Sequence, residues 1–342
     1  MSGSNSNMLQ TERKSDFSTN GLPWSQLSGC NVLVTGATGL IGGCLVDALM
    51  SNLNKEYNVY ASGRNEEYAF SRFSAFAEDK SFHFIKYDVL EPLQSDVDFD
   101  YIIHAASYAA PNAFATDPVG IMKANFDGVA NLLDYGLRHH LHRFLYISSG
   151  EVYGNGCQNK WMETDSGYID TLNPRSCYPS SKRAAETLCA AYSEQYGVDV
   201  IIARLCHTYG PKFTEKDNRA FAQFINKARN GEDIVLKSRG NQYRSWIYID
   251  DCVDAILTIL LKGTKGEAYN VADEKSCITI REFAETVAEI SGQKVLYDVE
   301  KSSKTESVIT KAIFDTTKLQ SLGWEPKHSI KEGVTKSIYN QK

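Results

Sequence analysis

Short apolar runs alternate with amphipathic stretches over residues 31–203. The run Val32–Val34 has the length and branching of a buried strand, and apolar residues then recur at helical spacing as far as Leu49. Further strands are predicted at 59–62, 82–85, 101–106, 144–147 and 198–203, and one of the helices between them covers 118–137. Because strands alternate with helices throughout, we expect a parallel sheet with helices on both faces.

Three glycines, Gly36, Gly39 and Gly42, connect the first strand to the first helix at three-residue spacing. In a dinucleotide-binding turn the first glycine permits a tight turn, the second lets the backbone approach a pyrophosphate, and the third allows close helix packing. The free amides at the helix N-terminus then face the phosphates. A glycine-rich turn without a ligand is the alternative, but the flanking strand and helix favour a cofactor site. We therefore predict a Rossmann-like, doubly wound α/β fold.

The remaining cofactor contacts are expected at the carboxyl ends of later strands. After the second strand, Gly63 and Arg64 stand where an NAD site usually has an acidic residue, and an arginine there favours NADP, although two glutamates follow. We therefore expect the cofactor to be NAD or NADP. The predicted cofactor-binding residues are Gly36, Thr38, Gly39, Leu40, Ile41, Gly42, Arg64, Asp88, Val89, His104, Ala105, Ala106, Asn125, Tyr178 and Lys182.

The regular alternation ends near Arg204, and a charged loop and irregularly spaced elements follow. This change divides the chain. We expect 1–28 to be a polar tail and 29–207, together with 243–272, to form an NAD(P)-binding Rossmann domain. The segments 208–242 and 273–342 are expected to form a smaller, interleaved α/β lobe that binds the substrate.

Composition and charge exclude several classes of protein. A net charge of -6 without a basic run argues against a nucleic-acid partner, and no apolar stretch is long enough to cross a membrane. The first 20 residues lack the apolar core of a secretory signal. The eight cysteines are scattered without a C-x-x-C pair, and no further ligand completes the histidines of 139–142. We therefore expect a cytoplasmic protein with reduced thiols and no metal site.

Candidate chemistry is concentrated at Tyr178 and Lys182, which are four residues apart at a predicted helix start and so share one face. A lysine ammonium beside a phenol favours the phenolate, so we expect Lys182 to lower the pKa of Tyr178. The phenolate then takes a proton from a sugar hydroxyl whose carbon gives hydride to the cofactor. Ser149, at a strand end, is placed to hydrogen-bond the same oxygen.

With these residues assembled, the sequence resembles the extended short-chain dehydrogenase/reductases, the NAD-dependent epimerase/dehydratase family, over about 29–332. Within the family it is most similar to UDP-glucuronate decarboxylases, through A-A-P-N at 109–112, N-P-R-S-C-Y at 173–178, K-R-A-A-E-T at 182–187 and D-N-R at 217–219. The resemblance implies a nucleotide-sugar substrate and a homodimer built through a helix bundle. It makes Ser149, Tyr178, Lys182 and Glu151 the catalytic residues, and Ser107, Ser149, Gly150, His207, Arg219 and Arg244 the substrate-binding residues.

Three departures from the family pattern bear on the reaction. Gly150 stands where the dehydratases have Asp and the decarboxylases have Ser, His207 replaces a usual Asn, and a C-terminal Arg has no clear match around 310–315. The leading hypothesis is an enzyme that oxidises a nucleotide-sugar at C4 and decarboxylates it. A nucleotide-sugar epimerase, an NADP-dependent keto-sugar reductase and a non-catalytic dinucleotide sensor remain the alternatives.

Overall fold

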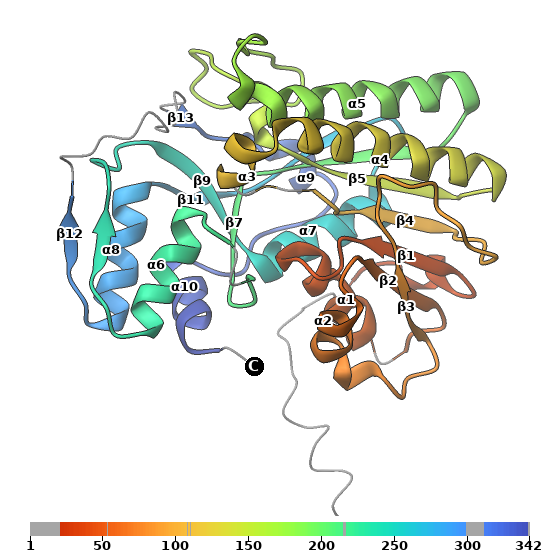
Figure 1. Cartoon of the computed structure of the whole chain (residues 1–342), viewed down its shortest axis with the longest axis horizontal. Helices are drawn as coiled ribbons and strands as arrows, with labels where there is room; N and C mark the ends of the chain where they lie inside the picture. Colours follow the sequence, from red (N-terminus) through yellow and green to blue (C-terminus); the bar gives the residue numbers. More distant parts are fainter. Residues whose placement is uncertain are drawn as a thin grey trace, which may run out of the picture.

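A seven-stranded parallel sheet lies at the centre of the computed structural model, which describes residues 21–52, 54–107, 109, 111–214, 217–298 and 311–340. The strand order is β10-β6-β5-β4-β1-β2-β3, and every neighbouring pair is parallel. Figure 1 shows β4, β1, β2 and β3 side by side. The strands are β1 (Asn31–Thr35), β2 (Asn58–Gly63), β3 (Phe82–Lys86), β4 (Tyr101–His104), β5 (Arg143–Ser149), β6 (Val200–Leu205) and β10 (Ala268–Val271). The predicted parallel, doubly wound sheet is confirmed. Residues 1–20 of the predicted tail and Ala110 of the A-A-P-N motif lie outside the described residues.

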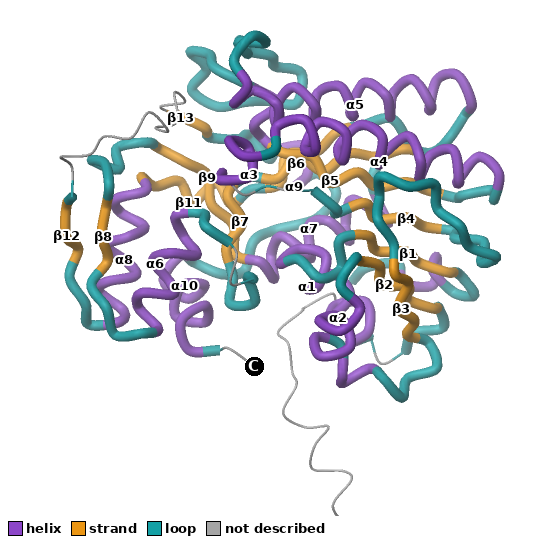
Figure 2. Tube along the Cα trace, viewed as in Figure 1, coloured by secondary structure: helices purple, strands orange, loops and turns teal. Residues whose placement is uncertain are grey.

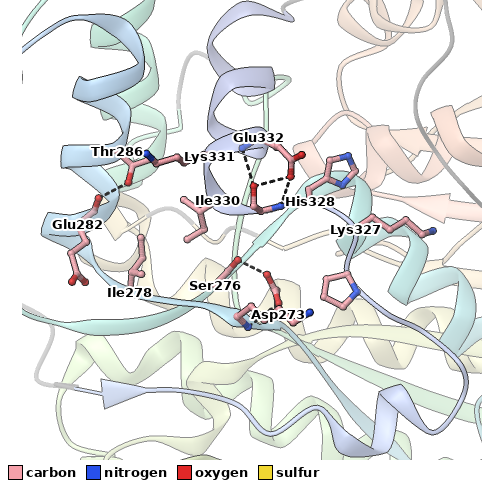
Figure 3. Close-up of a pocket in the computed structure, with 13 residues that line it drawn as sticks. Asp273, Ser276, Ile278, Glu282, Thr286, Lys327, His328, Ile330, Lys331 and Glu332 are labelled. Carbon is pink, nitrogen blue, oxygen red and sulfur yellow. Dashed lines mark hydrogen bonds between the residues drawn. The ribbon is translucent and has the colours of Figure 1, made fainter.

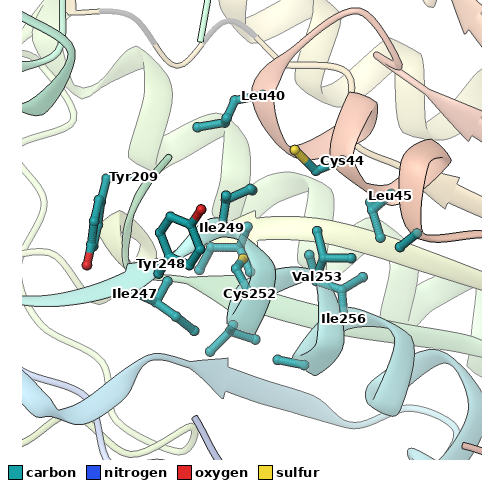
Figure 4. Close-up of a cluster of buried hydrophobic side chains, with 14 of the residues drawn as sticks. Leu40, Cys44, Leu45, Tyr209, Ile247, Tyr248, Ile249, Cys252, Val253 and Ile256 are labelled. Atoms are coloured by element: carbon teal, nitrogen blue, oxygen red, sulfur yellow. The ribbon is translucent and has the colours of Figure 1, made fainter. Parts of the chain in front are cut away.

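Two helical layers cover the sheet. On one face α4 (Pro118–Arg138) and α5 (Cys177–Tyr196) lie side by side, and on the other α1 (Leu40–Ser51) packs against α7 (Ile249–Lys262). Successive side chains of β1 point to opposite faces of the sheet and so pack under both helical layers. Val32 and Val34 belong to the core under α1 and α7, whereas Leu33 belongs to the core under α4 and α5. Figure 4 shows the first of these cores, where side chains of α1 face those of α7.

The long helices α4 and α5 are amphipathic rather than uniformly apolar. Their buried residues face the sheet, and their exposed faces carry charged and polar side chains together with Val119, Met122 and Phe126 of α4. Within the described part of the chain, no helix combines the length and the apolar character needed to span a bilayer.

The strand order reverses between β1 and β4. From β1 the chain builds outward through β2 and β3, and it then returns to build β4, β5 and β6 on the other side. In open α/β sheets a ligand crevice forms at this switch point, outside the carboxyl ends of the strands. The glycine turn after β1, the residues after β4 and the end of β5 therefore meet at one edge of the sheet.

A second lobe is built from the later part of the chain (Figure 2). Its four-stranded sheet contains β7 (His207–Tyr209), β9 (Tyr243–Tyr248), β11 (Asp273–Thr279) and β13 (Lys311–Ala312), and β8 (Ile234–Leu236) pairs with β12 (Val295–Tyr297). The helices α6 (Ala220–Arg229), α8 (Ile280–Ser291) and α10 (Ile330–Tyr339) pack on one another in this lobe. Because β7 and β9 lie beside the main sheet, the lobe brings its residues to the crevice; the exact domain limits given above stay a prediction.

The remaining elements are short. They are η1 (Trp24–Leu27), α2 (Glu66–Arg72), η2 (Ser74–Phe76), α3 (Pro111–Thr116), η3 (Gly150–Tyr153), η4 (Pro174–Ser176) and α9 (Thr317–Gln320). Of these, η3 and η4 matter most for the site, because η3 follows β5 directly and η4 precedes α5 directly.

Candidate active site

The glycine turn forms a close-fitting cradle at the start of α1. Gly36 has a φ of +65°, and a Cβ added to it would lie 2.7 Å from the backbone of Ala106. A Cβ on Gly42 would lie 2.8 Å from the carbonyl carbon of Gly36. Gly39 is the N-cap of α1 and offers no capping side chain, so the first-turn amides of Leu40 and Ile41 point out of the helix end. This cradle fits a dinucleotide pyrophosphate.

The ends of β2 and β3 extend the cradle. The Thr38 side chain packs over Gly63, whose added Cβ would lie 3.2 Å from Thr38 Cγ2. Beyond it, Arg64 Nη1 is 3.8 Å from the carboxylate of Asp88, and both side chains are substantially exposed. Val89 packs against α4, with its Cβ 3.1 Å from a Cβ built on Gly128. The predicted cofactor-binding residues Arg64, Asp88 and Val89 therefore lie close to one another, and the role of Arg64 stays a prediction.

His104, at the end of β4, is buried under the cradle. Its Nδ1 lies 2.7 Å from Thr35 Oγ1, and its Nε2 has no hydrogen-bond partner among the described residues. Burial, followed by the charge of Lys182, lowers the pKa of His104 to about 3. His104 is therefore a neutral imidazole at physiological pH.

A chain of hydrogen bonds ties the end of β4 to the start of α5. Ser107 Oγ donates to Asn125 Oδ1 at 2.7 Å, and Asn125 Nδ2 donates to Ser181 Oγ at 2.9 Å. Ser181 in turn donates to the carbonyl of Tyr178 at 3.0 Å. Asn125 is buried, so its amide ties the first turn of α5, which carries Tyr178, to Ser107 at the end of β4.

Three of the four predicted catalytic side chains converge at this point. Lys182 Nζ donates to the carbonyl of Ile147 at 2.8 Å, and it lies 4.6 Å from the ring centroid of Tyr146 and 5.8 Å from that of Tyr178. Ser149, the last residue of β5, hydrogen-bonds the Tyr178 side chain. The structure therefore brings Ser149, Tyr178 and Lys182 together at the carboxyl end of the sheet, as the spacing predicts.

The expected effect on acidity is different. Burial raises the pKa of Tyr178 to about 12, with a contribution from Glu151, while the bond to Ser149 and the charges of two arginines oppose the rise. Burial also lowers the pKa of Lys182 to about 7. The expected net lowering of the Tyr178 pKa is not found, because desolvation disfavours the charged form of both groups and outweighs the charges that favour the phenolate.

Gly150 and Glu151 form the turn after Ser149. Ser149 Oγ caps η3 by accepting the amide of Glu151 at 3.2 Å. Glu151 pairs with Arg175 through two contacts of 3.3 and 3.4 Å. At Gly150 an added Cβ would overlap the buried ring of Phe314, whose Cε2 would lie 2.6 Å away. A side chain at residue 150 would therefore require the ring of Phe314 to move.

The second lobe contributes two cationic groups and one imidazole. Arg244, on β9, is almost fully buried, and burial lowers its pKa to about 10 against the opposing charge of Glu151. Desolvation by the surrounding protein lowers the pKa of His207 to about 3, and the charges of Arg244 and Arg219 add to this effect. The residue nevertheless keeps part of its surface accessible to solvent. Arg219 forms a bidentate ion pair with Asp217, with its closest contact at 2.5 Å. Arg219 is therefore near the site, with its guanidinium paired to a carboxylate two residues before it.

Three residues that sequence reasoning passed over help to build the site. The Arg175 guanidinium lies 4.4 Å from the centroid of Phe114, whose ring stacks on Tyr178 at 4.8 Å. Arg183 fixes η3 from α5 by donating to the carbonyl of Tyr153 at 3.2 Å, among other backbone contacts. Arg175 and Arg183 stand inside the motifs quoted above, so their position was a usable signal.

Two further features lie away from this site. A cavity of about 480 Å³ between α8 and the start of α10 is lined by His328 and Lys327, among others (Figure 3). His328 pairs there with Asp251 at 2.9 Å. At the amino ends of β1, β4 and β5, three residues place one possible metal-ligating atom each within 4.8 Å of one another: Cys30, Asp100 and His142. The expectation of no metal site stays a prediction.

Comparison with known proteins adds to this geometry. The sequence profile of the NAD dependent epimerase/dehydratase family matches residues 32–272. UDP-glucuronic acid decarboxylase 6 of Arabidopsis thaliana is 34% identical over 310 residues, which are 90% of this chain and 87% of the relative. UDP-glucuronic acid 4-epimerase of Bacillus cereus, in complex with UDP-glucuronic acid and NAD, is 24% identical with a TM-score of 0.75, covering 90% of this chain and 98% of its own. dTDP-glucose 4,6-dehydratase of Streptomyces venezuelae, with NAD bound, is 22% identical with a TM-score of 0.77, covering 90% and 95%. The two structures show the fold.

Proposed function

Because the chain belongs to the NAD-dependent epimerase/dehydratase family, as the resemblance predicts, we propose that it oxidises a UDP-linked sugar at C4 and decarboxylates UDP-glucuronate. The observation that carries the proposal is the convergence of Ser149, Tyr178 and Lys182 beside the glycine cradle. The Arabidopsis relative, which spans nearly the same length, supports the choice of substrate and reaction. NAD is the cofactor that the family name and the cradle support.

The residues divide the first step between them. When bound, NAD supplies the hydride acceptor for C4 and a cationic ring whose charge favours the Tyr178 phenolate. Tyr178 takes the proton of the C4 hydroxyl, and Ser149 hydrogen-bonds the same oxygen. Lys182 holds the helix start to β5 through Ile147 and lies below the phenol ring, where its charge opposes the cost of forming the phenolate.

Loss of carbon dioxide then follows from the substrate's own chemistry. A 4-keto hexuronate is a β-keto acid, so the bond from C5 to the carboxylate breaks to release CO2 and leave an enolate, which takes a proton at C5. Return of the hydride to C4, with the proton going back from Tyr178 to the C4 oxygen, then gives a pentose, so the net change is the loss of CO2. Arg244, buried next to the site and short of full hydration, favours an anionic group. We assign Arg244 to the diphosphate of the substrate, because the diphosphate carries more negative charge than any other group of a UDP-sugar.

Mass spectrometry and proton NMR test the proposal. Purified protein is incubated with NAD and, in separate reactions, UDP-glucuronate, UDP-glucose or UDP-galactose. Loss of the mass of CO2 from the uronate alone supports decarboxylation. An unchanged mass with a new anomeric signal means epimerisation, and no change with any of the three overturns the assignment to UDP-sugars.

The Tyr178→Phe variant separates the enzyme from a non-catalytic dinucleotide sensor. Removing the hydroxyl deletes the proton acceptor but leaves the stacking of the ring on Phe114. We expect turnover to fall at least about 100-fold while NAD binding persists. A protein whose NAD-linked behaviour does not change with this substitution is a sensor.

We also propose a homodimer formed through α4 and α5, in the cytoplasm. The outer face of α4 exposes Val119, Met122 and Phe126, which recur at helical spacing and form an apolar stripe that a second copy can cover. The eight cysteines are all free thiols, which supports a reducing compartment. Sedimentation of wild type and of Phe126→Glu tests the dimer: the wild type should sediment as a dimer and the variant as a monomer.

A further inference from the structure

Arg175 and Glu151 form an ion pair at the edge of the candidate active site. Arg175 belongs to η4, directly before the helix that carries Tyr178, and Glu151 belongs to η3, directly after Ser149. Their two contacts are 3.3 and 3.4 Å, longer than the 2.7–2.9 Å of a strong charge-assisted bond. The side chains are 49% and 32% exposed. A pair with this length and exposure is weak, so a competing anion can separate it.

The Arg175 side chain keeps its orientation without Glu151. Its guanidinium carbon lies 4.4 Å from the ring centroid of Phe114, which is 2% exposed and stacks on Tyr178 with an interplanar angle of 25°. A guanidinium on an aromatic face is held in plane while its nitrogens stay available for two parallel bonds to a carboxylate. Arg175 is therefore preorganised for a planar anion beside the proton acceptor.

Glu151 is bound to its partner more weakly than the other carboxylates near the site. Two other carboxylates are already committed: Asp217 binds Arg219 through contacts of 2.5 to 3.1 Å, and Glu186 pairs with Arg204 at 2.7 Å. Glu151 makes only the two long contacts to Arg175 in the described part of the chain, and its charge opposes formation of the Tyr178 phenolate. In this arrangement Glu151 occupies the position of a ligand carboxylate.

We propose that Arg175 is a specificity-determining residue: the carboxylate of a nucleotide hexuronate displaces Glu151 and binds Arg175 in its place. This inference rests on the proposed function, since it names the group that recognises the uronate carboxyl. A neutral hexose lacks the charge needed for the exchange, so the Glu151–Arg175 pair persists when UDP-glucose binds. The exchange also places the released Glu151 carboxylate next to the sugar.

Calorimetric titration of the NAD-loaded protein tests the exchange. All variants carry Tyr178→Phe, so that no turnover occurs, and each is titrated with UDP-glucuronate and with UDP-glucose. We expect Arg175→Gln to weaken UDP-glucuronate binding about 10- to 100-fold and to change UDP-glucose binding less than about 3-fold. Arg175→Lys restores part of the uronate affinity, because it keeps the charge without the bidentate geometry.

The partner residue gives a result of opposite sign. Glu151→Gln removes the competitor for Arg175, so UDP-glucuronate should bind more tightly than to the parent, with little change for UDP-glucose. Arg281→Gln is the matched control, because Arg281 pairs with Glu285 on the exposed face of α8 in the other lobe. Unchanged NAD binding and circular dichroism verify that each variant is folded.

The outcomes separate this inference from the proposed function. If the Tyr178→Phe parent binds neither UDP-sugar, both fail. If the parent binds UDP-glucuronate but Arg175→Gln weakens both sugars equally or neither, only the role of Arg175 is overturned. Weaker uronate binding by Glu151→Gln also overturns it, because the carboxylate is then a contact and not a competitor.

Discussion

The fit between Gly150 and Phe314 makes a quantitative prediction for Gly150→Ala. The added Cβ would overlap the ring and lie 2.6 Å from Cε2, whereas carbons in contact are about 3.5 to 4.0 Å apart. The ring must therefore move by at least about 1 Å, although it is only 3% exposed and packs within a buried cluster. Overpacking of this kind costs about 1 to 3 kcal/mol of the free energy of unfolding.

A double-mutant cycle isolates that cost. Phe314→Ala alone should cost about 3 to 5 kcal/mol, because it leaves a cavity beside Tyr153 and Trp161. In that background Gly150→Ala meets no ring, so its cost should fall to about zero and the coupling should be about 1 to 3 kcal/mol. Urea unfolding measures each value, with circular dichroism and fluorescence required to report the same transition.

Gly266→Ala is the control for the backbone. Gly266 has a φ of +78° and nothing within 4 Å of its added Cβ, so its substitution costs about 1 to 2 kcal/mol through conformation alone. That cost should be the same with and without Phe314. If Gly150→Ala also costs the same in both backgrounds, the overlap with Phe314 is not the reason for glycine at this position.

Three further predictions concern the cradle, the active site and the second lobe. Lys182→Met should reduce turnover of UDP-glucuronate at least about 100-fold, measured as kcat, because the contact to Ile147 and the charge below the phenol are both lost. Arg64→Ser should change the KM for NAD less than about 3-fold, since Arg64 is more than half exposed; a selective loss of NADP binding would instead assign it to a 2′-phosphate. His328 has its pKa raised by the bond to Asp251, so its ion pair stabilises the fold fully below the ordinary pKa of 6.5 and loses that effect as pH rises through the raised value. The stability difference between wild type and His328→Gln, measured by thermal unfolding from pH 5 to 9, should therefore shrink with rising pH, and a constant difference would contradict this assignment.

The cradle and the parallel sheet were predictable because their signals are local. Glycine spacing, short apolar runs and the four-residue spacing of Tyr178 and Lys182 each act within one element or one turn. The strands of the second lobe were harder, because β12 and β13 have only three and two residues, so their hydrophobic period is too short to recognise.

The parts of the site that sequence reasoning missed depend on distant residues or on burial. Nothing near Gly150 indicates that Phe314, more than 160 residues later, fills its side-chain space. The spacing of Tyr178 and Lys182 predicts where they lie but not their acidity, which is decided by desolvation from several elements. The ion pair of Arg219 with Asp217, two residues before it, also depends on the local fold, and the predicted role of Arg219 at the substrate stays a prediction.

The position of β10 at the edge of the main sheet affects the nascent chain. β6 (Val200–Leu205) is paired on one side with β5, which precedes it, but its other side is covered only by β10. β10 is synthesised about 60 residues after β6 ends, or about 3 to 12 s later at typical rates of 5 to 20 residues per second. During that interval the apolar strand β6 presents an unpaired edge, the kind of surface that recruits other strands. Productive synthesis of this protein therefore depends on preventing the edge of β6 from pairing with other chains until residues 268–271 have been synthesised. A chaperone bound to the edge, or a low concentration of nascent chains, has this effect.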